Sequence, residues 1–259
     1  MSPWPGVRFE TDLTDRIQRQ MWAGMYEPHV RECFDALLQP GNVYVDVGAH
    51  IGYHAVFAAH RVGPTGRVYA FEADPSMYER LNRNLTQFPW AQAVHGAVWS
   101  RTGELSFERS AEREESGWGT VCAVRDSTGG EHISVQAVAL DDWCRDLKLP
   151  GWDAMKLDAE GSEISVLQGA ANAIKQFHPA LILEINGILL REAGESAGHL
   201  VELLRELGYR VFYLSFRRLV PWDAAQHSEF GEVLCVPEKR QAQILGRLAE
   251  SFSVCGTRS

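Results

Sequence analysis

The chain has 259 residues, with 25 Lys and Arg against 34 Asp and Glu, and a formal net charge of −9 at pH 7. With 45% hydrophobic and 23% charged residues, its composition is that of a globular protein with one large core. The acidic balance argues against general binding to nucleic acid or to anionic lipid, so we expect neither as a partner.

Targeting signals and cysteine spacing indicate a cellular location. The chain opens without a basic run followed by an apolar stretch, and no stretch reaches the roughly 18 uninterrupted apolar residues of a membrane span. Its five cysteines are scattered, and none forms a C-x-x-C pair. We therefore expect a cytoplasmic protein with neither a membrane span nor a disulfide framework.

The first hundred residues predict a helical cap followed by alternating strands and helices. Apolar spacing over residues 14–38 indicates two helices that are broken near Pro28, so residues 1–40 would form an N-terminal helical cap. Beyond them, short apolar runs predict strands and amphipathic spacing predicts helices. The predicted elements are a strand at 43–47, a helix at 52–62, a strand at 67–71, a helix at 74–85 and a strand at 91–99.

The alternation of strands and helices is interrupted between residues 100 and 140. Turn residues there surround two expected strands, near 104–109 and 132–140. We interpret this stretch as a β-hairpin insertion, with a loop that contains Trp118, an aromatic side chain that could stack on a sugar ring. Alternation then resumes. The later predicted elements are a strand at 152–157, a helix at 161–176, a strand at 180–185, a helix at 195–207 and strands at 209–214 and 231–236.

This order predicts a doubly wound α/β fold. The seven strands outside the insertion would form one mostly parallel sheet with helices on both faces, within a main domain over residues 41–259. The last two strands are separated by a loop rather than by a clear helix, so we expect them to pair antiparallel.

The turn after the first strand is the first candidate ligand site, because ligands in such sheets bind at the carboxyl ends of the strands. Asp46 ends this strand, Gly48 would permit a tight turn, and Gly52 would permit close packing or close approach of a ligand. Glu72 ends the next strand, where its carboxylate could accept hydrogen bonds from both hydroxyls of a ribose. This arrangement predicts a cofactor that contains adenosine.

The glycine spacing helps to choose among such cofactors. A dinucleotide site needs G-x-G-x-x-G, and a P-loop needs Gly-Lys-Ser/Thr, whereas this chain has G-x-x-x-G with His50 and Ile51 inside it. Asp46 would repel a pyrophosphate but could bind an ammonium group. S-adenosylmethionine (SAM) carries an ammonium and no phosphate, so the residues favour SAM over NAD. An NAD-dependent oxidoreductase and an ordinary βα turn with a stray acid remain the alternatives.

Charged residues also end the fourth predicted strand. Strand alternation places Lys156 and Asp158 on the same face, and a lysine in an apolar strand needs a carboxylate partner. We expect this pairing to keep Asp158 ionised, so that it can orient or deprotonate an acceptor hydroxyl. The alternative is a structural ion pair, with Glu160 and Glu163 favouring the N-terminus of the next helix.

Several other polar residues have less specific interpretations. Glu184 ends the fifth strand and could bind the acceptor or, with Asp158, a Mg²⁺ ion that acidifies a hydroxyl. His50 and His54 lie four residues apart but lack the general-base Glu of a zinc protease motif, so we expect no zinc. We expect His54 to be a packed helix residue. For Glu27 we favour an ordinary turn before a helix, with a position covering the site as the alternative.

Five segments together resemble the FkbM-type family of SAM-dependent methyltransferases. Their order and spacing match the family over roughly residues 24–186, and the Lys-x-Asp-x-Glu-Gly run at 156–161 is the most specific of them. The segments run from Tyr44 to Tyr53, from Phe71 to Pro75, from Leu140 to Trp143, from Met155 to Ala170 and from Pro179 to Ile185.

The resemblance implies a class I methyltransferase fold and O-methylation of a small-molecule, sugar or natural-product hydroxyl, with S-adenosylhomocysteine as the product. It implies that the chain holds the methionine end of SAM near Asp46, the ribose at Glu72 and the adenine beside Ala73. A non-catalytic SAM-binding subunit remains an alternative. The predicted cofactor-binding residues are Asp46, Gly48, Ala49, His50, Gly52, Glu72, Ala73, Ala97 and Asp158, and the predicted catalytic residues are Asp158, Lys156, Glu160 and Glu184.

Overall fold

A computed structural model describes residues 4, 6–109, 120–121, 131–223 and 230–254 of the chain. Within them, the main sheet is built from β1 (Val43–Val47), β2 (Arg67–Glu72), β3 (Ala91–His95), β8 (Ala154–Leu157), β9 (Ala180–Asn186), β10 (Tyr209–Ser215), β11 (Arg218–Pro221), β12 (Phe230–Pro237) and β13 (Ser253–Val254).

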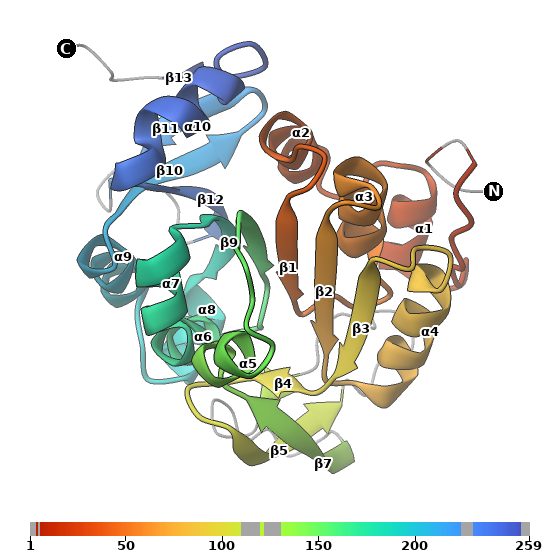
Figure 1. Cartoon of the computed structure of the whole chain (residues 1–259). Helices are drawn as coiled ribbons and strands as arrows, with labels where there is room; N and C mark the ends of the chain where they lie inside the picture. The colour runs from red at the N-terminus through yellow and green to blue at the C-terminus, as the bar shows by residue number, and fades with distance from the viewer. Residues whose placement is uncertain (1–3, 5, 110–119, 122–130, 224–229, 255–259) are drawn as a thin grey trace.

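The strand order of this sheet confirms the predicted architecture. The order is β13-β11-β10-β12-β9-β8-β1-β2-β3, and neighbouring strands from β9 to β3 are parallel (Figure 1). β12 pairs antiparallel with β10, as expected for the last two predicted strands. It also pairs antiparallel with β9. Two short strands that were not predicted, β11 and β13, extend the edge beyond β10.

Helices cover both faces of the sheet (Figure 1). No helix in the described ranges has the length and apolar character needed to cross a membrane. The helices are α1 (Arg16–Trp22), α2 (Pro28–Leu37), α3 (Tyr53–Val62), α4 (Pro75–Leu85), α5 (Leu140–Asp146), α6 (Glu163–Gly169), α7 (Ala171–Phe177), α8 (Gly187–Glu192), α9 (Ala197–Glu206) and α10 (Gln241–Leu248), with a short 3₁₀ helix at Glu238–Arg240.

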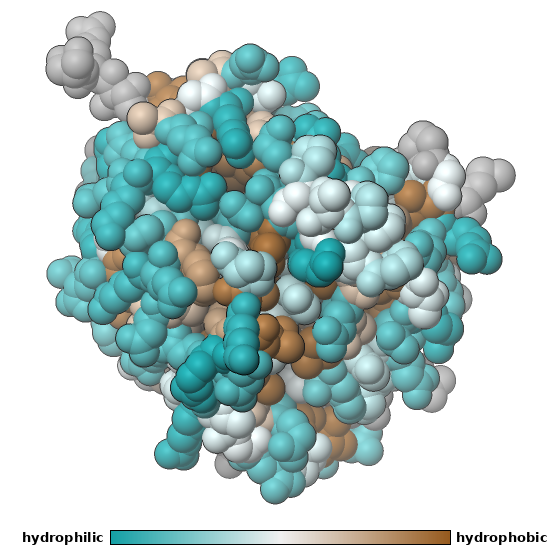
Figure 2. Space-filling model, in the orientation of Figure 1, coloured by the Kyte–Doolittle hydropathy of each residue, from teal (hydrophilic) through white to brown (hydrophobic). Residues whose placement is uncertain are grey.

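The two faces follow from the alternation of side chains along each strand. In β1, Tyr44 packs into the core beneath α2, α3 and α10, whereas Val45 and Val47 pack into the core beneath α5, α6 and α9. Because both faces are covered, β1 is buried at every position, as is typical of a central parallel strand. In the view of Figure 2, the surface of the molecule is mostly hydrophilic, with hydrophobic side chains visible in recesses near its centre.

The insertion forms a second, smaller sheet near the carboxyl ends of β2 and β3 (Figure 1). The predicted strand at 91–99 is wrong as a single element, because it divides at Gly96 into β3 and a strand of the small sheet. Trp118 and its predicted loop lie outside the described residues. The small sheet has the order β4-β7-β5-β6, with β4 (Ala97–Val98), β5 (Gly103–Arg109), β6 (Thr120–Val121) and β7 (Glu131–Val138).

Other differences from the predicted elements have local causes. The helix expected at 161–176 is two helices, α6 and α7, because the backbone between them leaves the helical conformation at Ala170 (φ −116°, ψ 2°). The short helix α5 was not predicted. Its Asp141 accepts hydrogen bonds from the backbone N–H groups of Asn172 and Ala173, so α5 stabilises the start of α7. Helices α8 and α10 were also missed.

Candidate active site

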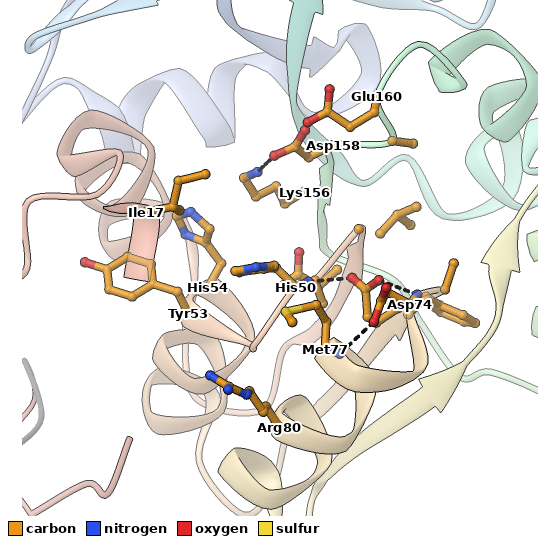
Figure 3. Close-up of a pocket in the computed structure, with 18 of the residues that line it drawn as sticks. Ile17, His50, Tyr53, His54, Asp74, Met77, Arg80, Lys156, Asp158 and Glu160 are labelled. Carbon is orange, nitrogen blue, oxygen red and sulfur yellow. Dashed lines mark hydrogen bonds and ion pairs between the residues drawn. The ribbon is translucent and has the colours of Figure 1, made fainter. Parts of the chain in front are cut away.

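A cavity of about 570 Å³ opens at the carboxyl ends of β1, β2 and β8. Its walls come from these strand ends, from the N-terminal segment through α1, from α4 and from the small sheet. In Figure 3, Lys156, Asp158 and Glu160 gather on one side, and Met77 and Arg80 lie on the opposite side. The cavity is therefore at the edge where a doubly wound sheet binds its ligands.

The turn between β1 and α3 depends on two glycines with positive φ angles. A Cβ on Gly48 (φ 76°) would lie 1.8 Å from the carbonyl oxygen of Asp158, so only glycine lets the turn pass this close to β8. A Cβ on Gly52 (φ 90°) would lie 2.7 Å from Cδ1 of Leu81 on α4. Gly48 lines the cavity, whereas Gly52 supports the packing of α3 against α4.

Backbone N–H groups of this turn are already used within the protein. Gly48 and Ala49 donate to the carbonyl oxygen of Phe71, at 3.1 and 2.9 Å, and His50 donates to Oε2 of Glu72 at 2.8 Å. A dinucleotide pyrophosphate would need such N–H groups to be directed at the ligand. The turn therefore lacks the anion cradle of a dinucleotide site at these three positions.

Glu72 holds the ends of β1 and β2 together while it lines the cavity. Its second oxygen accepts a hydrogen bond from the N–H of Asp74 at 2.8 Å. Burial raises the pKa of Glu72 to about 7, against the effect of these backbone hydrogen bonds. Burial also lowers the pKa of the neighbouring His50 to about 4, so this imidazole is neutral at pH 7.

Asp46 is the most deeply buried acid of the cavity, with 1% of its surface exposed. Both carboxylate oxygens are buried, and neither has a hydrogen-bond partner among the described residues. Burial raises its pKa to about 7, although the nearby charge of Lys156 acts in the opposite direction. A buried carboxylate without a partner is costly, so the site favours a ligand that brings a hydrogen-bond donor or a positive charge.

Lys156 makes the contact expected from strand alternation. Its Nζ lies 2.7 Å from Oδ2 of Asp158 and 3.5 Å from Oε2 of Glu27. Burial alone would favour the neutral amine, but the charges of Asp158 and Glu27 outweigh it and raise the pKa of Lys156 well above its ordinary value. Lys156 is therefore a cation that holds carboxylates and is unsuited to be a base.

The loop after β8 adds further carboxyl groups. Glu163 accepts hydrogen bonds from the N–H groups of Ala159 and Gly161, both at 3.2 Å, so it stabilises the loop as the structural interpretation expected. Glu160 lines the cavity, and burial together with the charges of Asp158 and Glu184 raises its pKa well above the ordinary value. The protonated form of Glu160 is therefore favoured relative to an exposed glutamate.

Glu184 lies in β9, outside the lining of the cavity, and is paired in register with Glu232 of β12. Burial and the charge of Asp158 raise the pKa of Glu184 to about 8. Within the described ranges, no group of three or more His, Cys, Asp or Glu residues could hold a metal ion. The structure thus gives no support to the Mg²⁺ alternative.

Most of the predicted site residues meet in this one cavity. Those that line it are Asp46, Gly48, Ala49, His50, Glu72, Ala73, Ala97, Lys156, Asp158 and Glu160, whereas Gly52 and Glu184 do not. The prediction that His54 is simply a packed helix residue is incomplete, because it is buried and also lines the cavity.

Two parts of the site lie outside the predicted catalytic and cofactor-binding residues. The N-terminal segment borders the cavity through Asp12 and Gln18, which contact Arg80 of α4 at 3.5 and 3.1 Å. Glu27, for which an ordinary turn was favoured over a position covering the site, contacts both Lys156 and His54. The only signal for this role in the sequence was that a glutamate directly precedes Pro28 at the start of a helix. The residues usually found at that position are Ser, Thr, Asp and Asn.

Comparisons with known proteins extend these observations. The family model described as "Methyltransferase FkbM domain" matches residues 46–211. The chain is 29% identical over 146 residues to hexuronic acid methyltransferase AglP of Haloferax volcanii, covering 56% of each chain. It is 24% identical over 155 residues to 2-O-methyltransferase NoeI of Sinorhizobium fredii, covering 56% of this chain and 63% of that one.

The aligned region thus spans a little more than half the length of these two relatives. Among solved structures, methyltransferase FkbM from Methylobacillus flagellatus aligns with a TM-score of 0.46 and 16% identity, over 88% of this chain and 56% of that chain.

Proposed function

The chain belongs to the family of FkbM-domain methyltransferases, and we propose that it transfers a methyl group from SAM to a hydroxyl of a sugar or another small molecule. AglP is named for hexuronic acid and NoeI for 2-O-methylation, which supports a sugar-like acceptor. The cavity supports the use of SAM.

The observation that carries this proposal is the buried carboxylate of Asp46, which has no hydrogen-bond partner in the described part of the chain and lies in the same cavity as Glu72. Asp46 would bind the ammonium group of SAM, and Glu72 would accept hydrogen bonds from its ribose hydroxyls. Ala73 and Ala97 line the cavity near Glu72 and would border the adenine. SAM supplies a methyl group bonded to a positively charged sulfur, which acidic walls accommodate well.

An NAD-dependent oxidoreductase fits these residues less well. The N–H groups of Gly48, Ala49 and His50 already have acceptors within the protein. Asp46 would also repel a pyrophosphate. Both features oppose a dinucleotide and leave SAM binding unaffected.

Asp158 is the residue that we propose to act on the acceptor. Its carboxylate lines the cavity and is held by Lys156 at 2.7 Å. It would accept a hydrogen bond from the acceptor hydroxyl, orient its oxygen and take its proton. Lys156 keeps this carboxylate in place, and Glu160, whose pKa is raised by burial, could donate a hydrogen bond to the acceptor in its protonated form.

The direct test is methyl transfer from radiolabelled SAM to a panel of sugars and small alcohols. We expect the wild type to label at least one acceptor and Asp158→Asn to lower kcat by about 100-fold or more, a range typical for loss of a general base. Asp146→Asn, on the exposed end of α5, is the matched control and should behave as wild type.

Two outcomes would contradict this proposal. SAM binding without transfer to any acceptor would favour a non-catalytic subunit. Thermal stabilisation by NADH but not by S-adenosylhomocysteine would favour an oxidoreductase.

A further inference from the structure

Helix α2 begins in an unusual way. Its N-cap is Glu27, which has φ 40° and ψ 56° and whose side chain makes no capping hydrogen bond. At other helix starts, Asp15 and Asp74 have extended backbones and accept hydrogen bonds from backbone N–H groups. The left-handed conformation costs a non-glycine residue about 1 kcal/mol or more, and helical conformations are further disfavoured before proline. Helix capping therefore does not explain Glu27.

The side chain of Glu27 turns inward to the catalytic side of the cavity. Its Oε2 lies 2.8 Å from Nε2 of His54 and 3.5 Å from Nζ of Lys156. Lys156 points to the face of the sheet that α2 and α3 cover, since it is in register with Asp46 and shares that face with Ala154 of the same core. Glu27, His54 and Lys156 come from three separate segments and converge at one point.

The charge states of Glu27, His54 and Lys156 are those expected from their contacts with one another. Burial alone would favour a neutral Glu27, but the charge of Lys156 and the hydrogen bond with His54 hold its pKa well below the ordinary value. Burial lowers the pKa of His54, so the imidazole is neutral and donates through Nε2 to Glu27. Lys156 therefore contacts two carboxyl groups, that of Glu27 at 3.5 Å and that of Asp158 at 2.7 Å.

We propose that Glu27 is a positioning residue, which fixes Lys156 so that the carboxylate of Asp158 faces the acceptor. This inference rests on the proposed methyl transfer. With its second partner lost, the buried ammonium would depend on Asp158 or turn toward the neighbouring Asp46, and it would thereby pull the base out of its productive orientation. Because Glu27 does not line the cavity, it acts through the residues that it contacts there, Lys156, His54 and Tyr26.

The test compares Glu27→Gln, which keeps the shape but removes the charge, with Glu32→Gln on the same helix. Glu32 lies 3.4 Å from Arg217 at the surface and serves as the matched control. We expect Glu27→Gln to lower kcat by about 10- to 100-fold while KM for SAM changes less than about 3-fold, since only orientation is lost. Glu32→Gln should match the wild type in both.

A second measurement does not depend on activity. The ¹⁵Nζ NMR signal of Lys156, assigned by its loss in Lys156→Met, should shift in Glu27→Gln and stay in place in Glu32→Gln. Glu27→Asp keeps the charge with a shorter side chain and should restore kcat to an intermediate value. If Glu27→Gln does not fold, Glu27→Asp carries the test alone, and a wild-type kcat for it would overturn the inference.

The two proposals fail in different ways. An active wild type whose kcat is unaffected by Glu27→Gln overturns the role of Glu27 and leaves the methyltransferase in place. A ¹⁵Nζ signal of Lys156 that does not shift in Glu27→Gln also overturns the role of Glu27. A folded wild type that transfers no methyl group to any acceptor overturns the proposed function, and the inference with it.

Discussion

Asp46 illustrates how one residue can select the charge of a ligand. Its carboxylate ends a fully buried strand and has no partner for either oxygen within the described part of the chain. Burial raises its pKa to about 7, so near neutral pH a bound cation and a proton compete for it. SAM binding should therefore release protons and should depend on pH.

We predict that the affinity for SAM rises between pH 5.5 and 7.5, by up to about tenfold per pH unit for each carboxyl that must ionise. The α-amino group of SAM stays protonated in this range, because such groups titrate near pH 8. Asp46→Asn should weaken binding at pH 7.5 by roughly 10- to 100-fold and flatten the pH dependence. Titration calorimetry at several pH values measures both effects. Asp142→Asn, on the exposed side of α5, is the control, and an unchanged slope in Asp46→Asn would contradict the prediction.

Sequence reasoning could find the residues that end strands but not their partners from distant helices. Asp46, Glu72 and Asp158 meet in one cavity because parallel strands end at the same edge of a sheet. Glu27 reaches Lys156 only because α2 packs across that face, and such packing has no local signature in the sequence. Glu184 was placed at the rim of the cavity because its strand was expected to end at residue 185. In the structure β9 continues to Asn186.

At the scale of elements, the β1–α3 turn positions most of the cofactor side of the cavity. It passes so close to β8 that Gly48 touches the loop after that strand. The same loop carries Asp158 and Glu160, so the geometry of the turn also sets the distance between the cofactor side and the acceptor side of the cavity.

Gly48→Ala should therefore destabilise the protein severely. The new Cβ would lie 1.8 Å from the carbonyl oxygen of Asp158, in a backbone conformation that L-residues rarely adopt. We expect a loss of more than about 3 kcal/mol in the free energy of unfolding. Gly194→Ala has a similar φ of 77° but open space around the new Cβ, so it should cost only about 1 kcal/mol. Chemical denaturation compares the two, and equal losses would show that the close contact has no effect.

The order of the major elements was predictable because strand and helix periodicities differ clearly. Short elements whose stability depends on tertiary contacts were not. Helix α5 is an example, since it is stabilised partly through hydrogen bonds from Asp141 to α7. The division between β3 and β4 depends on Gly96, where a Cβ would lie 2.7 Å from the carbonyl oxygen of Gln136 in β7. A strand pattern that continues through a glycine does not reveal such a change of sheet.

At the scale of the whole molecule, several charges that contribute to the net value of −9 lie inside the protein. Burial raises the pKa of Asp46, Glu72 and Glu163 to about 7 and the pKa of Glu184 to about 8. At these carboxyl groups the folded chain therefore binds more protons than the unfolded chain between about pH 4.5 and 8. By linkage, this contribution to stability is lost as the pH rises through that window.

We predict that the melting temperature without ligand falls by a few degrees between about pH 6.5 and 8. Buried His50 and His54 act in the opposite direction below pH 6.5, because their lowered pKa values disfavour the folded state when the unfolded histidines become charged. The two histidines should thus make the dependence of stability on pH shallower below pH 6.5. Saturating SAM should reduce the loss at pH 8. Thermal scans between pH 6.5 and 8 measure the melting temperature. An increase in melting temperature over this range would contradict the proposed effect of the buried carboxyl groups.

The central claim is that the acidic cavity binds SAM, and titration calorimetry on the folded wild-type chain and on Glu72→Ala tests it most directly. We predict one SAM per chain for the wild type, binding of S-adenosylhomocysteine at the same site, no binding of NADH, and loss of SAM binding in Glu72→Ala. A folded wild type that shows no binding heat at millimolar SAM, or that binds NADH instead, would contradict the claim.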